Sequence, residues 1–329
     1  NTGIAPDKPG MNPAQAIYSK VLKKPINWTR YKHHTENGVE QMKVYIMTDL
    51  EGVAGIMDYG NWCSEKSRYY ENAKELLSKE INAAVEGFLE GGATEILIAD
   101  GHGSGAVNPE LLHEKVELSR YGVSLFIAKE KIDFLAFVGQ HPMAGTIGGH
   151  LSHSGNFSVV EQTINGLIVG EFGDLVLTAG QQDIRTIFAT GCEAFCGEAQ
   201  ALVPGIETVA VKRGTQTTAG NHLPKEVYRE HNKSAIHLHP AEARKRIKAG
   251  ARKAIERAQK EKFGLIELPK PPYERIRIMR GDSDYPPRIL KQSHPKSILD
   301  MRHSKVSLYE LEINPADPKL SKLIGKQIA

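Results

Sequence analysis

The hydrophobic positions along the chain change period repeatedly, which predicts alternating strands and helices. The apolar run Val44-Tyr-Ile-Met-Thr48 predicts a strand over residues 43–49. Apolar residues at spacings of three and four then predict a helix over residues 66–91, which Gly91-Gly92 ends. A second strand, Glu95–Ala99, follows directly. A strand, a helix and a strand in this order form a β-α-β unit, so the two strands are expected to be parallel.

Further segments continue this alternation toward the C-terminus. The segments predicted to form strands are Phe134–Val138, Leu167–Val169, Val176–Ala179, Val209–Lys212 and Arg275–Met279, and a long helix is predicted over residues 240–262. The expected fold class is α/β: a three-layer core with a mainly parallel sheet, plus a smaller α+β part and extended N- and C-terminal segments. We therefore divide the chain into an N-terminal extension (1–41), an α/β domain (42–280) and a C-terminal extension (281–329).

Composition and charge narrow the class of protein. The chain has 329 residues, of which 40% are apolar and 25% charged, as is ordinary for a globular protein. No apolar stretch reaches the roughly 18 residues that a membrane span needs, and a net charge of +3 does not call for a nucleic-acid partner. The basic stretch Arg244–Lys262 has apolar residues at helical spacing, so we expect a helix with a solvated basic face. The three cysteines make no disulfide framework, and Cys192 and Cys196 are expected to be buried on one helix face.

Candidate metal ligands follow three of the predicted strands. Asp49 and Glu51 stand at the end of the first strand, His102 follows the second, and His141 follows Phe134–Val138. The carboxyl ends of parallel strands share one edge of a sheet, where α/β proteins gather their sites. Two carboxylates aimed at one place repel each other unless a cation or a shared proton offsets them. Together with His153 and Glu171 further on, these side chains form the mixed carboxylate and imidazole set typical of Zn, Mn or Fe hydrolytic sites.

A longer set of motifs resembles the DppA-type D-aminopeptidase family, which comprises zinc-dependent bacterial peptidases. The motifs that carry the resemblance are Met47-Thr-Asp-Leu-Glu-Gly-Val-Ala-Gly55, Asp100-Gly-His102, Gly139-Gln-His141, Ser152-His-Ser154 and Val169-Gly-Glu-Phe-Gly173. Their order and spacing match from about Met42 to Lys212, and more loosely to about Met279.

The resemblance implies a function, a cofactor and an assembly. It implies an aminopeptidase that hydrolyses short peptides with an N-terminal D-amino acid. It further implies two zinc ions (Zn2+) per subunit, held by residues matching Asp49, Glu51, His102, His141 and Glu171, with Asp49 as the bridge. The residue matching His153 is the catalytic group, acting as nucleophile or general base. The implied assembly is a ring-like homo-oligomer, a decamer of two five-membered rings, with no nucleic-acid or membrane partner.

Several positions leave alternatives open. The family often carries an acidic Gly-Asp-Asp element where this chain has Thr190-Gly-Cys-Glu-Ala194, which bears on the preferred substrate. His150 lies three residues before His153 and competes with it for the catalytic role, although we expect it to be a local support or an exposed residue. Ser152 and Ser154 are candidates to orient His153. The compartment expected from the family is the cytoplasm, while the start at Asn1 rather than Met leaves export open.

Three other functions compete with the peptidase. The glycines of Gly101-His-Gly-Ser-Gly105 suggest a dinucleotide site, but their spacing is wrong and Pro109 interrupts any following helix. Another dinuclear metal hydrolase, a phosphoesterase or an amidase, would use the same ligand types, yet no arginine or lysine adjoins the motifs in sequence to hold a phosphate. A non-catalytic scaffold that keeps the fold would be expected to have lost at least one ligand, and all five are present.

Overall fold

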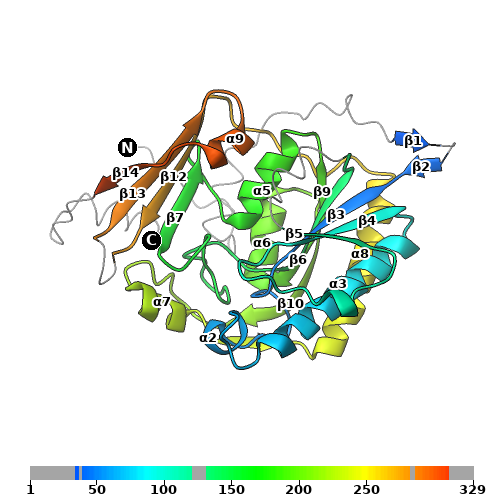
Figure 1. Cartoon of the computed structure of the whole chain (residues 1–329), viewed down its shortest axis with the longest axis horizontal. Helices are drawn as coiled ribbons and strands as arrows, with labels where there is room; N and C mark the ends of the chain where they lie inside the picture. Colours follow the sequence, from blue (N-terminus) through cyan, green and yellow to red (C-terminus); the bar gives the residue numbers. More distant parts are fainter. Residues whose placement is uncertain (1–33, 37–38, 121–130, 282–285, 311–329) are drawn as a thin grey trace, which may run out of the picture.

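The computed structural model describes residues 34–36, 39–120, 131–281 and 286–310, and they form two sheets (Figure 1). The larger sheet has seven strands in the order β11-β10-β9-β6-β3-β4-β5. All neighbours in it are parallel except β10 and β11. The bounds of its strands are β3 Lys43–Thr48, β4 Glu95–Asp100, β5 Glu117–Arg120, β6 Phe134–Gln140, β9 Arg185–Cys192, β10 Glu207–Gly214 and β11 Ala235–His237.

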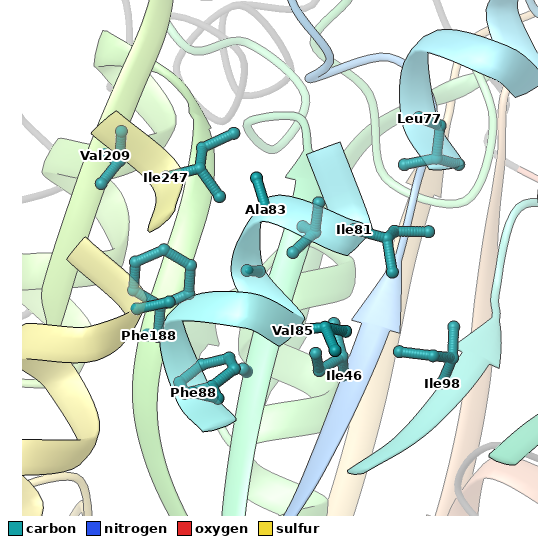
Figure 2. Packing of buried hydrophobic residues seen from close by; sticks show 14 of the residues in the cluster. Ile46, Leu77, Ile81, Ala83, Val85, Phe88, Ile98, Phe188, Val209 and Ile247 are labelled. Atoms are coloured by element: carbon teal, nitrogen blue, oxygen red, sulfur yellow. The ribbon is translucent and has the colours of Figure 1, made fainter. Parts of the chain in front are cut away.

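Helices cover both faces of this sheet and make the core three layers deep. Helices α3 (Tyr70–Glu90) and α8 (Pro240–Ala258) pack on one face, and α5 (Glu171–Gly180) and α6 (Glu193–Leu202) pack on the other. Side chains of a strand alternate between the two layers: on β3, Val44 and Ile46 join the core under α3, while Tyr45 joins the core under α5. Figure 2 shows the first core, in which Phe88 and Phe188 meet edge to face at 5.6 Å.

The smaller sheet is antiparallel and lies beyond α5 (Figure 1). Its five strands follow the order β14-β13-β12-β7-β8, with bounds β7 Val159–Ile164, β8 Leu167–Ile168, β12 Tyr273–Met279, β13 Arg288–His294 and β14 Ser307–Glu310. Helix α9 (Ile298–His303) follows β13 and contributes Ile298 and Met301 to the core under α5. The expected α/β class with a smaller α+β part is confirmed.

Short elements complete the described chain. They are the hairpin β1 (His34–Glu36) and β2 (Val39–Gln41), the helices α2 (Tyr59–Trp62) and α7 (Lys225–His231), and the 3-10 turn η2 (Pro109–Leu111). Most of the predicted N-terminal extension, and the C-terminal segment from residue 311, lie outside the described residues. Within the part that the structure describes, no helix is both long and apolar enough to cross a bilayer.

Two sequence-based predictions need correction, and a third is confirmed. Val176–Ala179, predicted as a strand, lies in α5, where consecutive residues are buried because the helix sits between the two sheets. The strand predicted at Leu167–Val169 is confirmed as β8, which pairs with β7 in the smaller sheet. Cys192 does not lie within a helix with Cys196, since it is the last residue of β9 and precedes α6; both thiols are free and buried.

Candidate active site

The carboxyl edge of the larger sheet brings the predicted ligands together. In this edge Thr48 of β3 pairs with Asp100 of β4 on one side and with Val138 of β6 on the other. The chain leaves β3 and β4 at this level and leaves β6 after Gln140, and the Asp49 amide still donates to the Val138 carbonyl at 2.9 Å. Three adjacent strands therefore deliver Asp49, His102 and His141 to one place.

Glycine allows the two loops after β3 and β6 to approach closely. The Gly52 amide donates to the Gly139 carbonyl at 2.7 Å. A Cβ at Gly52 would lie 2.2 Å from the Gln140 carbonyl oxygen, and Gly139 has a φ of +79°, which side chains other than glycine rarely adopt. The glycine of the D-x-E-G sequence is thus needed for steric reasons, whereas its two carboxylates are needed for the chemistry of the site.

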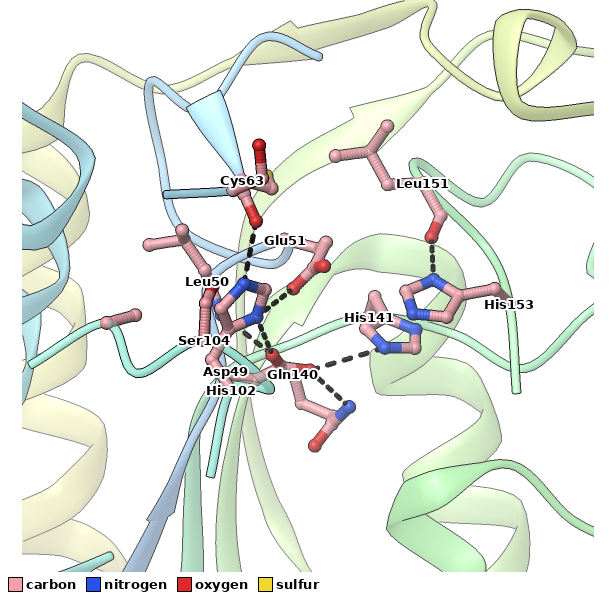
Figure 3. Close-up of polar contacts among 12 residues, drawn as sticks. Asp49, Leu50, Glu51, Cys63, His102, Ser104, Gln140, His141, Leu151 and His153 are labelled. Atoms are coloured by element: carbon pink, nitrogen blue, oxygen red, sulfur yellow. Dashed lines mark hydrogen bonds and ion pairs between the residues drawn. The ribbon is translucent and has the colours of Figure 1, made fainter. Parts of the chain in front are cut away.

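Asp49 lies at the centre of the cluster, and its two oxygens face different ligand sets (Figure 3). Its Oδ1 is 3.1 Å from His102 Nδ1, which is also 3.2 Å from Glu51 Oε2. Its Oδ2 is 3.2 Å from His141 Nε2, which is 3.3 Å from Glu171 Oε1. Spacings near 3 Å between potential ligand atoms are those expected around a shared cation with bonds of about 2.0–2.2 Å.

Glu171 and His153 close the cluster on the far side of His141. Glu171 is the first residue of α5, where a carboxylate is favoured by the helix dipole, and the Gly155 amide donates to its Oε1 at 2.7 Å. His153 Nε2 is 3.6 Å from the same oxygen. The imidazole of His153 stacks on His141 with ring centroids 3.8 Å apart. All six residues predicted from the sequence are therefore brought together.

Each of the three histidines has one ring nitrogen fixed by a backbone carbonyl. His102 Nε2 is 2.8 Å from the Cys63 oxygen, His141 Nδ1 is 2.9 Å from the Pro142 oxygen, and His153 Nδ1 is 2.8 Å from the Leu151 oxygen. A carbonyl only accepts, so these nitrogens carry the protons and the opposite nitrogens present lone pairs to the carboxylates. This arrangement is typical of metal-bound histidines. The carbonyl of Leu151, rather than Ser152 or Ser154, orients His153.

The electrostatics of the cluster favour the binding of a cation. Burial, with Glu51 beside it, raises the pKa of Asp49 to about 7. Burial opposes protonation of His141, but Glu171 and Asp49 outweigh it and raise the pKa of that imidazole to about 10. Glu51 Oε2 and His141 Nε2 are buried without a hydrogen-bond partner among the described residues. Unsatisfied buried ligand atoms of this kind fit a bound metal ion, which takes the place of the protons.

His153 differs from the other two imidazoles in its charge. Burial, together with neighbouring His141, lowers the pKa of His153 to about 4. The ring is therefore neutral at pH 7, with its lone pair on Nε2. A neutral, oriented imidazole next to a metal cluster can accept a proton or attack a carbonyl carbon.

Two supporting residues were not found from the sequence. Gln140, the last residue of β6, precedes the candidate ligand His141, and its Nε2 donates to Asp49 Oδ2 at 2.9 Å. Lys212 of β10 is buried, and its ammonium donates to the carbonyls of Glu51 at 2.5 Å and Val53 at 2.9 Å, which holds the loop after β3. The strand pattern placed Lys212 at the end of a strand, but a lysine that points inward leaves no signal in a hydrophobic pattern.

A cavity of about 570 Å³ opens over the cluster and contains all six predicted residues. Its remaining wall comes from α2, from the residues that follow α2 and β4, and from the loop before β7; these are Tyr59, Ser64, Glu65, Lys66, Gly101, Gly103, Ser104 and Gly155. Lys66 thus places a cation at the site even though no lysine adjoins the motifs in sequence. His150 does not line the cavity: it is fully buried, with Nε2 3.2 Å from the Met57 oxygen, and supports a loop. Cys192 and Glu193 also lie outside the cavity wall.

Known proteins are similar to this chain in both sequence and fold. The family model described as D-aminopeptidase, peptidase family M55, matches residues 42–233. A D-aminopeptidase of Bacillus subtilis (strain 168) is 31% identical over 183 residues, which cover 54% of this chain and 66% of the relative. The match therefore spans just under two thirds of that relative. The solved structure of the Zn-dependent D-aminopeptidase DppA from Bacillus subtilis, a self-compartmentalizing protease, has a similar fold, with a TM-score of 0.66 and 23% identity over 80% of this chain and 94% of that chain.

Proposed function

The chain belongs to the D-aminopeptidase family, and on that premise we propose that it is a zinc-dependent aminopeptidase acting on short peptides with an N-terminal D-residue. The observation that carries the proposal is the position of Asp49, whose two oxygens face two separate ligand sets at 3.1 and 3.2 Å. A bridging carboxylate of this kind is the usual basis of two-metal hydrolysis.

In this proposal the five ligands divide between two zinc ions. Asp49, Glu51 and His102 would hold one ion, and Asp49, His141 and Glu171 would hold the other. Zinc would supply Lewis-acid polarisation of the scissile carbonyl and of water. The lone pairs on His102 Nδ1 and His141 Nε2 point toward the carboxylates because the opposite nitrogens donate to backbone carbonyls.

His153 is proposed as the catalytic group. Its Nδ1 is held as a donor by the Leu151 carbonyl, so the proton it accepts during the reaction is received at Nε2. The low pKa of about 4 keeps this nitrogen free of a proton at neutral pH. Phe157, whose ring centroid is 4.6 Å from that of His153, excludes water from one side of the imidazole.

The proposal extends to the assembly. The related DppA is a self-compartmentalizing protease, and we propose that this chain likewise forms a ring-shaped homo-oligomer, a decamer. Light scattering on the purified protein is expected to give ten times the chain mass of 36.3 kDa. A monomer at micromolar concentration would contradict this part of the proposal and leave the catalytic part standing.

A small panel of substrates tests the activity. We expect the zinc-loaded protein to hydrolyse D-Ala-D-Ala, to leave L-Ala-L-Ala and an aryl phosphate intact, and to lose activity in a chelator. His153→Ala should retain zinc and lose at least about 100-fold in kcat, the usual range for a general base. His222→Ala, at an exposed histidine outside the cavity wall, is the matched control. Hydrolysis of the aryl phosphate alone would replace the peptidase with a phosphoesterase.

A further inference from the structure

A second cavity, of about 280 Å³, adjoins the candidate active site beside His153. It shares Tyr59, His153 and Gly155 with the larger cavity, so the two are continuous at the proposed catalytic histidine. The rest of its wall is Asn156, Phe157 and three charged residues of α7. Helix α7 lies beside α2 at this end of the molecule (Figure 1). A peptide bound with its scissile bond at His153 therefore has room on this side.

Two cations of α7 face this cavity. Lys225 and Arg229 are four residues apart, which places them on the same side of the helix, and both are half-buried. Like charges at this spacing destabilise a helix unless an anion offsets them. Two carboxylates are near. Glu226 shares the cavity wall but is exposed, and Glu230 is bound more closely by Lys233, at 2.8 Å, than by Arg229, at 3.6 Å.

The guanidinium of Arg229 has unused hydrogen-bonding capacity. Its Nε is buried and makes no hydrogen bond within the described part of the chain, because Glu230 Oε1, at 3.6 Å, lies beyond hydrogen-bond distance. A buried donor without a partner is costly, and a carboxylate is its best acceptor.

The wall that carries these cations is anchored to the loop between β6 and β7, which also carries His153. Tyr228, between Lys225 and Arg229 on the helix, is fully buried, and its hydroxyl accepts the Gly145 amide at 2.8 Å. The guanidinium of Arg280 lies 3.8 Å from the centre of the Tyr228 ring. The ring of Phe157 then connects Tyr228 to His153, with centroid distances of 6.3 and 4.6 Å. The cations of α7 are thus held at a set position relative to His153.

We propose that Lys225 and Arg229 form a subsite for the free C-terminal carboxylate of a short peptide substrate. This inference rests on the proposed aminopeptidase function and adds the chemical class of the leaving group. The amino end of the peptide lies at the metal cluster, the scissile carbonyl lies at His153, and the carboxylate reaches α7. The subsite selects against peptides whose carboxyl end is amidated, because an amide carries no charge to offset Lys225 and Arg229 and is a weaker acceptor for the buried N–H of Arg229.

The test compares D-Ala-D-Ala with D-Ala-D-Ala amide, which differ in one charge at the carboxyl end. The zinc-loaded wild-type protein is expected to have a kcat/KM about tenfold higher for the free acid, since a hydrogen bond to a charged group is typically sufficient for a factor of this size. Arg229→Met and Lys225→Met should each remove most of this preference, mainly through KM for the acid, and Arg229→Lys should restore part of it. Lys260→Met is the control for the loss of a positive charge, because Lys260 is exposed and lies outside this cavity wall.

The outcomes separate the subsite from the activity. A preference for the acid that falls in both Met variants and persists in the control supports the subsite. Equal turnover of acid and amide by the wild-type protein overturns the subsite and leaves the aminopeptidase function intact, as does a preference that both Met variants retain. Turnover of neither peptide overturns the proposed function and the subsite with it.

Discussion

Lys212 offers a sharp test of how the fold positions the metal-binding loop. Its ammonium is buried under residues 51–56 and donates to the carbonyls of Glu51, Val53 and Ile56 at 2.5, 2.9 and 3.4 Å. Glu80 holds the same loop from another side by accepting the Ala54 amide at 2.9 Å. The substitution Lys212→Met keeps the length of the side chain and removes all three donors.

The expected loss of stability follows from the two shorter hydrogen bonds of Lys212. Each buried carbonyl that loses its partner costs about 1–3 kcal/mol, so two of them cost about 4 kcal/mol together. Removing a buried ammonium relieves part of its desolvation penalty and offsets about half of that loss. We expect a net loss of about 2 kcal/mol in the free energy of unfolding. The loosened loop carries the ligand Glu51, so zinc affinity is expected to fall about tenfold, as for other changes around the ligands of a metal.

Two measurements check this reasoning. Urea unfolding of the apo-protein gives the loss in stability, and competition with a chromophoric chelator gives the zinc affinity. Lys233→Met, at an exposed lysine, is the control for removal of a positive charge. A Lys212→Met protein that is as stable as the wild type, and that binds zinc as tightly, would refute the argument.

Three further predictions concern the site and its surroundings. Asp49→Asn is expected to lose both zinc ions, whereas Glu171→Gln loses only one, because only Asp49 faces both ligand sets; equal losses by elemental analysis would contradict the bridging role. Gly52→Ala is expected to lower zinc binding, since its Cβ would lie 2.2 Å from the Gln140 oxygen, while the Cβ of Gly60→Ala would meet only Asp58 Oδ1 at an ordinary contact distance of 3.6 Å, so this variant should bind zinc normally. Burial and nearby Lys212 lower the pKa of His150 to about 2, so its contribution to stability is complete above pH 6.5 and is lost as the pH falls below that value. The difference in unfolding free energy between the wild type and His150→Gln should therefore shrink by about 2 kcal/mol from pH 7 to pH 5 in a chelator, and a constant difference would be inconsistent with a buried neutral imidazole.

The sequence predicted the candidate site better than it predicted the smaller sheet. Asp49, His102 and His141 could be placed together because each follows an apolar strand, and parallel strands end at a common edge. By contrast, Arg275 of β12 pairs with Ile164 of β7, and no local pattern shows that these distant segments are neighbours. The prediction of a strand at Val176–Ala179 is wrong because a short apolar run has the same sequence pattern in a buried helix as in a buried strand.

The supporting residues of the site were harder to predict than its ligands. Gln140 and Lys212 act through the direction of a side chain in three dimensions, which spacing along the sequence does not encode. The subsite on α7 was missed for a related reason. Lys225 and Arg229 resemble solvated surface residues, and only the fold places them in a cavity beside His153.

The most direct test of the account is a zinc titration of the metal-free protein, followed by the hydrolysis of D-Ala-D-Ala. The five proposed ligands, which are Asp49 and the four residues around it, predict that activity is absent without zinc and reaches its maximum when two zinc ions are bound per chain. Full activity in the metal-free protein, or zinc binding that leaves the peptide intact at every ratio, would contradict the account.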